Sequence, residues 1–115
     1  MLGRVIKDII LDTWNVFEDE FKIFWKEFVK CPVEANEEYM NEYIQEIFED
    51  TLGYAGCKMI RRIYGLAHVN DIDSIGDIHI KEKVQNKALS FGRELIVKRK
   101  EFYNINNVIK KVSTY

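Results

Sequence analysis

Apolar residues at the start of the chain recur at every third or fourth position, which is the spacing of one face of a helix. The stripe consists of Ile6, Ile10, Trp14, Phe17, Phe21, Phe24 and Phe28. Charged residues such as Asp12 and Glu20 lie outside this stripe. Cys31-Pro32 should end the helix, because a residue that precedes proline is driven out of the α region. The pattern therefore predicts one long amphipathic helix before Pro32.

A second helix is predicted from Asn36, whose side chain can cap free N–H groups. Glu37 and Glu38 suit the positive end of that helix. Its apolar face is predicted to contain Tyr39, Met40, Tyr43, Ile44, Ile47 and Phe48. The small residues that follow, from Gly53 to Cys57, would let another backbone approach closely. We expect a third helical segment to run through Met59, Ile60 and Ile63 and to fade near Gly65.

The helical pattern breaks between Ala67 and Ile80, where a polar loop is predicted. A further helix is expected from Lys81 to Lys98, with Val84, Ala88, Phe91, Leu95 and Ile96 inside. A final short helix is expected from Asn106 to Val112. No segment alternates like a strand, and no repeat or flexible linker is evident. The predicted fold class is all-α, with about five helices in a single segment over residues 1–115.

Composition narrows the range of functions. The chain has 115 residues, a net charge of −2, 47% apolar and 31% charged residues, as expected of one globular domain or less. The mild acidity argues against nucleic-acid binding, so we expect the late basic residues, including Lys98, Arg99 and Lys100, to form a solvated helix face. No apolar run approaches the roughly 20 residues that span a membrane. Cys31 and Cys57 are expected to be reduced thiols of a cytoplasmic protein.

Two loop motifs offer candidate chemistry. The segment from Asp71 to Glu82 matches several positions of an EF-hand calcium loop, but Ile75 supplies no oxygen where a ligand is needed. Gly76-Asp77-Ile78-His79 resembles the catalytic loop of small-molecule kinases, in which the aspartate accepts the substrate hydroxyl proton. Its neighbours Ile75 and Glu82 are the wrong residues for that loop, so coincidence explains the match better. His68 has no companion at zinc-ligand spacing and is expected to be a capping or core residue.

Arg61 and Arg62 form the other candidate site. Adjacent residues of a helix point about 100° apart, so both reach one site only if the helix end faces it. A guanidinium suits phosphate or carboxylate because its planar fork donates two parallel hydrogen bonds. The residues alone leave open a plain surface pair balanced by Glu49 and Asp50.

Those arginines lie within a long and specific run, Gly-x-Ala-Gly-Cys-x-x-Ile-Arg-Arg-x-x-Gly-Leu-Ala-His-Val, which begins at Gly53. The run resembles the C-terminal region of the S-methyl-5-thioribose kinases, and the flanks from Trp14 to Trp25 and from Gly92 to Tyr103 agree more loosely. The resemblance implies the helical C-terminal subdomain of a protein-kinase-like, aminoglycoside phosphotransferase fold. It implies a reaction that moves the γ-phosphoryl group of ATP, with magnesium, to the 1-hydroxyl of methylthioribose in methionine salvage. It also implies a dimer, and it assigns Arg61 and Arg62 to catalysis and substrate binding at the sugar site.

Other parts of such a kinase have no counterpart in this sequence. We find no glycine-rich nucleotide loop, no ATP-anchoring lysine, no catalytic-loop aspartate and no metal-binding Asp-x-Glu. We therefore expect no cofactor in this chain, with ATP and magnesium held elsewhere in the full-length kinase, and an inactive fragment whose partner is the rest of the kinase chain or a second copy. The alternative is a non-catalytic helical interaction or dimerisation module that exposes the apolar face of Trp14, Phe17, Phe21, Phe24 and Trp25.

Overall fold

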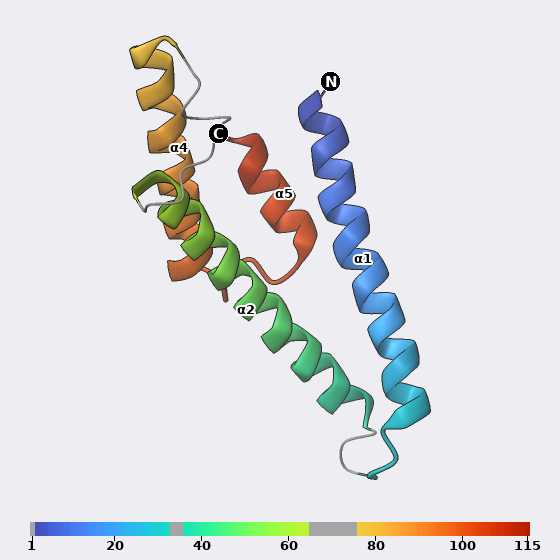
Figure 1. Cartoon of the computed structure of the whole chain (residues 1–115). Helices are drawn as coiled ribbons and strands as arrows, with labels where there is room; N and C mark the ends of the chain where they lie inside the picture. Colours follow the sequence, from blue (N-terminus) through green and yellow to red (C-terminus); the bar gives the residue numbers. More distant parts are fainter. Residues whose placement is uncertain (1, 33–35, 65–75) are drawn as a thin grey trace. The chain divides into compact units, whose positions relative to one another are not determined.

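The computed structural model describes residues 2–32, 36–64 and 76–115, and within these ranges the chain forms four helices and no strand (Figure 1). The helices are α1 (Leu2–Phe28), α2 (Glu37–Tyr64), α4 (Ile78–Val97) and α5 (Ile105–Ser113). The predicted all-α class is confirmed. The contacts divide the chain into two compact units, Met1–Phe48 with Tyr103–Thr114 and Glu49–Phe102 with Tyr115.

The first unit contains α1, the first half of α2, and α5. Aromatic side chains join α1 to α2: the rings of Trp14 and Phe48 lie 5.0 Å apart, and Phe21 stacks on Tyr43 at 5.9 Å. Met40, Ile44 and Phe48 are buried on α2, as the predicted apolar face required. α5 lies along α1, where the Lys7 ammonium donates a hydrogen bond of 2.9 Å to the Ser113 hydroxyl (Figure 1).

The predicted apolar stripe of α1 divides into two sets of residues. Trp14 and Phe21, together with Trp25 beside the stripe, face aromatic rings of α2. The remaining members are 40–63% exposed: Ile6, Ile10, Phe17, Phe24 and Phe28. The stripe spans more of the circumference of α1 than the aromatic contacts with α2 cover, so part of it remains exposed.

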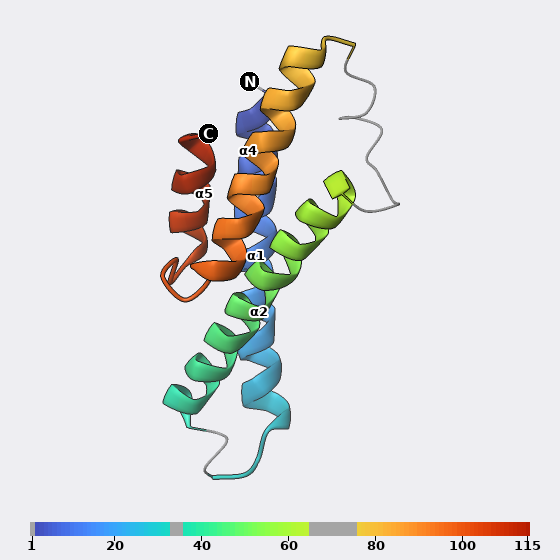
Figure 2. The same cartoon turned by 90° about the vertical axis from the view of Figure 1, so that its left-hand side faces the viewer.

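The second unit contains the rest of α2, which crosses α4 (Figure 2). A Cβ atom built on Gly92 would lie 3.1 Å from the carbonyl oxygen of Gly56, so the two backbones approach very closely at the crossing. Leu52, Ile63 and Leu95 are buried in this unit. The expectation that small residues admit a second backbone is correct.

The expected break between a second and a third helix is wrong, because α2 continues from Glu37 to Tyr64 without interruption. A glycine inside a helix costs only about 1 kcal/mol relative to alanine. The packing of Gly56 on α4 offsets that cost, so small residues here serve a helix crossing and do not end the helix.

The predicted Asn36 cap is confirmed, and two further helices begin at caps that were not predicted. The Asn36 side chain accepts a hydrogen bond of 2.7 Å from the Glu38 amide at the start of α2. α4 begins at Ile78, three residues before the predicted Lys81, because the Asp77 carboxylate accepts from the amides of His79 and Ile80. In the same way Asn104 caps α5 by accepting from Asn107.

Candidate functional site

Arg61 and Arg62 lie in the last turn of α2. Both side chains are exposed. Within the described ranges neither guanidinium has a hydrogen-bond or ion-pair partner, so the alternative of a surface pair balanced by Glu49 and Asp50 is not formed there. The twin arginines therefore present their donors to solvent in this structure.

Among the described residues, the two arginines do not line the same groove. Arg61 lines an open groove of about 670 Å³, and Arg62 is not part of it. The other residues that line this groove, which we call the Arg61 groove, are Asp50, Gly53, Tyr54, Cys57, Lys58, Ile96 and Arg99. The α2 members lie along one side of the helix, with two adjacent pairs among them, whereas Arg62 lies about 100° round the helix from Arg61. Arg61 lines the groove together with Ile96 of α4 and with Arg99, which follows α4.

Arg99 is the second guanidinium of the Arg61 groove, and its place there was not predicted. Its Nη1 donates a hydrogen bond of 2.7 Å to the Ile96 carbonyl oxygen. Its Cδ lies 3.6 Å from the point where a Cβ atom of Gly53 would stand. Arg99 is half-buried, so the expectation that the late basic residues all form a solvated face is wrong for this residue.

The Arg61 groove is strongly cationic. Among the described residues, Lys58, Arg61 and Arg99 line it together with one acidic residue, Asp50. Tyr54 and Ile96 add apolar surface to its walls. Such a combination fits a small anionic ligand, because guanidinium and ammonium groups bind phosphate or carboxylate oxygens while apolar walls bind carbon.

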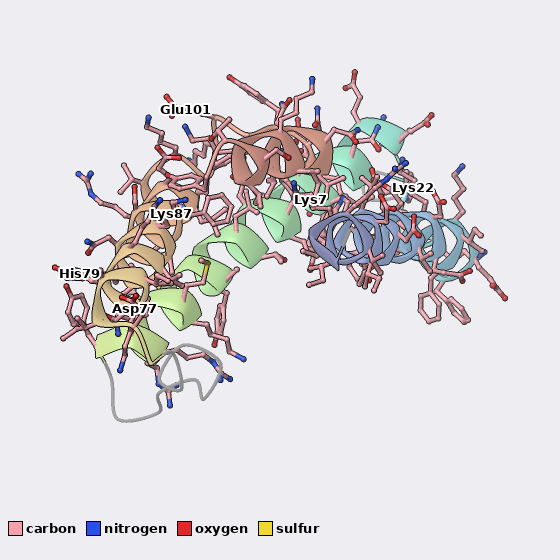
Figure 3. All side chains as sticks on the ribbon, turned by 90° about the horizontal axis from the view of Figure 1, so that it is seen from above. Lys7, Lys22, Asp77, His79, Lys87 and Glu101 are labelled. Carbon is pink, nitrogen blue, oxygen red and sulfur yellow. The ribbon has the colours of Figure 1, made fainter. Side chains whose placement is uncertain are left out.

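Asp77 has a structural role. Its Oδ1 accepts hydrogen bonds of 2.9 Å from the amide of His79 and 3.2 Å from that of Ile80. Figure 3 shows Asp77 and His79 together at the first turn of α4. An N-cap aspartate explains the Gly76-Asp77-Ile78-His79 sequence without a catalytic loop.

The remaining candidates gather no further site in the part of the chain that the structure describes. Asp71, Asp73, Ile75 and His68 lie outside the described residues, and Glu82 is exposed on α4. No group of three or more histidine, cysteine, aspartate or glutamate side chains is arranged to hold a metal ion among the described residues. Cys31 and Cys57 are free and exposed. None of the helices in the described ranges combines the length and apolar character needed to cross a membrane.

No family model matches the chain. It is nevertheless similar to curated relatives that share one name. It is 35% identical over 107 residues to the methylthioribose kinase of Yersinia pseudotuberculosis serotype IB (strain PB1/+), a match that covers 93% of this chain and 26% of that protein. It is 41% identical over 87 residues to the methylthioribose kinase of Bacillus cereus (strain AH187), covering 73% of this chain and 21% of that protein.

The matched stretch makes up only part of each relative. The chain spans about a quarter of the length of these curated proteins. The likeness extends along most of the chain and is not confined to the run that contains Arg61 and Arg62. The predicted resemblance is therefore confirmed: this chain is similar to a segment, about a quarter in length, of the methylthioribose kinases.

Proposed function

We propose that this chain is the C-terminal helical part of a methylthioribose kinase. Such an enzyme phosphorylates the 1-hydroxyl of S-methyl-5-thioribose with ATP, a step of methionine salvage in the cytoplasm. The observation that carries the proposal is the 35% identity over 93% of the chain, which extends far beyond any single motif. The all-helical architecture supports it, because the C-terminal subdomain of a kinase-like fold is helical.

Arg61 and Arg62 are the proposed catalytic and substrate-binding residues. Both stand in the last turn of α2 with exposed guanidinium groups. Negative charge spreads over the phosphoryl oxygens during transfer, and a positioned guanidinium stabilises that charge. Because they point about 100° apart, both can act at one site only if the end of α2 faces that site, and both stand in its last turn.

The rest of the active site would come from other sequence. Phosphoryl transfer depends on holding ATP and magnesium in position, and this chain has neither a glycine-rich nucleotide loop nor a metal-binding Asp-x-Glu. We propose that the chain alone does not turn over methylthioribose. Its partner is the remainder of a kinase chain, and a kinase homodimer would place two copies together.

A segment exchange tests this proposal. The matched stretch of the Yersinia pseudotuberculosis methylthioribose kinase is replaced by the corresponding residues of this chain, and phosphorylation of methylthioribose is measured. We expect the hybrid to retain turnover within about tenfold of the parent, because residues that fill the same place at 35% identity keep the same packing pattern. A folded hybrid, checked by its melting transition, that shows no turnover would contradict the proposal.

One observation favours a second function, that of a helical interaction module. Phe24 and Phe28 on α1 are 63% and 59% exposed, although their ring centroids lie only 4.3 Å apart. Exposed apolar patches of this kind drive association. This candidate predicts that two copies associate through α1, that light scattering gives the mass of a dimer, and that Phe24→Lys restores the monomer. A monomer at all concentrations removes this candidate and leaves the kinase proposal standing.

A further inference from the structure

We propose that the Arg61 groove binds the phosphate group of a small phosphate ester, and that Arg99 is a second phosphate-binding guanidinium in it. The inference rests on the proposed function for the identity of the ester, since a kinase acting on a sugar makes a sugar phosphate. It goes beyond that function because Arg99 and Lys58 are residues that the twin-arginine motif does not contain.

The geometry of Arg99 is the first support. Its stem passes over Gly53, where the absence of a side chain leaves room, with Cδ 3.6 Å from the position of a Gly53 Cβ. Its Nη1 is tied to the Ile96 carbonyl at 2.7 Å. A long side chain held at its stem and at one nitrogen loses less conformational entropy when it binds a ligand. The remaining N–H donors of the fork are then positioned for an anion.

The charge of the groove is the second support. Lys58, Arg61 and Arg99 outnumber the Asp50 carboxylate. Like charges gathered on one surface repel each other, and a ligand of opposite sign relieves that repulsion. Methylthioribose carries no charge, so it gains little from this field. The phosphorylated product, or a phosphate of the nucleotide, gains much more from it, so the charge of the groove favours a phosphate ester over the uncharged sugar.

The size of the groove is the third support. Its volume of about 670 Å³ lies within the usual range for small-molecule sites, and Tyr54 and Ile96 are among the residues that line it. These side chains offer carbon surface next to the cationic groups. A ligand with a charged end and a compact organic body, such as a pentose phosphate, fits this division of the lining.

Phosphate binding by the full 115-residue chain tests the inference. The probes are ribose 5-phosphate, pyrophosphate and neutral ribose, and binding is followed by the ¹⁵N side-chain resonances of the arginines. We expect ribose 5-phosphate to shift Arg61 and Arg99 and ribose to shift neither. Tighter binding of pyrophosphate than of ribose 5-phosphate would assign the groove to the nucleotide phosphates, and the reverse order would assign it to the sugar phosphate. Equal binding of ribose and ribose 5-phosphate would overturn the inference.

Matched variants distinguish a specific role of Arg99 in phosphate binding from a general effect of positive charge. Arg99→Ala is expected to weaken ribose 5-phosphate binding about tenfold or more, because a charge-assisted hydrogen bond is lost. Arg93→Ala removes the same charge from an exposed position of α4 outside the groove and should leave binding unchanged. Arg99→Lys keeps the charge but not the planar fork, so it should weaken ribose 5-phosphate binding less than Arg99→Ala and more than Arg93→Ala. Equal effects of Arg99→Ala and Arg93→Ala would overturn the role of Arg99.

Gly53 provides an independent variant. Gly53→Leu places a branched side chain where the Arg99 stem lies, so it should weaken phosphate binding while Arg99 itself is intact. Gly53→Ala adds only a contact at 3.6 Å, an ordinary van der Waals distance, and should leave phosphate binding unchanged. Unchanged phosphate binding in a folded Gly53→Leu variant would contradict the proposed position of the Arg99 side chain over Gly53. All of these results are separate from turnover of the hybrid kinase, which can succeed even if the groove binds no phosphate.

Discussion

Gly56 and Gly92 face each other where α2 crosses α4, with so little space that a Cβ atom on Gly56 would overlap the Gly92 carbonyl oxygen. The same Cβ atom would lie 2.8 Å from Cγ1 of Ile96. Because the nearest atom belongs to the backbone, it cannot move aside as a flexible side chain would. Gly56→Ala should therefore push the helices apart and lower the free energy of unfolding by about 1–3 kcal/mol, which urea denaturation would measure.

Gly53→Ala is the matched control, one helical turn earlier on α2. The nearest atom to its new Cβ is the Arg99 Cδ at 3.6 Å, so no overlap arises. Alanine is the better helix former by about 1 kcal/mol, and this variant should be neutral or slightly more stable. Equal destabilisation by Gly53→Ala and Gly56→Ala would show that the close crossing is not the cause.

The Asp77 cap gives the second prediction. Asp77→Ala removes the acceptor for the amides of His79 and Ile80 and should cost about 1 kcal/mol of stability, with loss of helical signal from the start of α4. Asp77→Asn keeps the acceptor and should cost much less. The same Asp77→Asn variant in the hybrid kinase should retain turnover, whereas a catalytic aspartate would lose it.

The two sets of residues on α1 give the third prediction. Phe21 is half-buried and stacks on Tyr43, so Phe21→Ala should lower the free energy of unfolding by about 2 kcal/mol. Phe24 is 63% exposed, and Phe24→Ala should change it by no more than about 0.5 kcal/mol. Both substitutions change helix propensity equally, so chemical denaturation of the pair isolates packing. Similar losses would mean that the exposed part of the stripe is covered in solution.

The sequence predicted local features well. The long first helix, the Asn36 cap and the buried Met40 and Ile44 all follow from period and capping chemistry, which act over a few residues. The continuous α2 was missed because Gly53 and Gly56 have the composition of a break. Whether small residues end a helix or admit a neighbour depends on a partner such as Gly92, which lies far away in the sequence.

The candidate site was also predicted only in part, because its geometry depends on contacts between residues far apart in the sequence. Arg61 and Arg62 were found because they stand in a specific run, but their separation onto different surfaces depends on what packs beside α2. Arg99 was taken for part of a solvated basic face, since nothing local reveals that its stem lies on Gly53.

The most direct measurement is the rate of methylthioribose phosphorylation by the hybrid kinase that carries this segment, compared for Arg61→Ala, Arg62→Ala and Arg93→Ala. We expect Arg61→Ala and Arg62→Ala each to lower kcat by about 100-fold or more, because each removes a guanidinium that stabilises the transferred phosphoryl group. Arg93→Ala should leave kcat within about twofold of the unsubstituted hybrid, given its exposed position outside the Arg61 groove. Unchanged turnover in folded Arg61→Ala and Arg62→Ala variants would contradict the account.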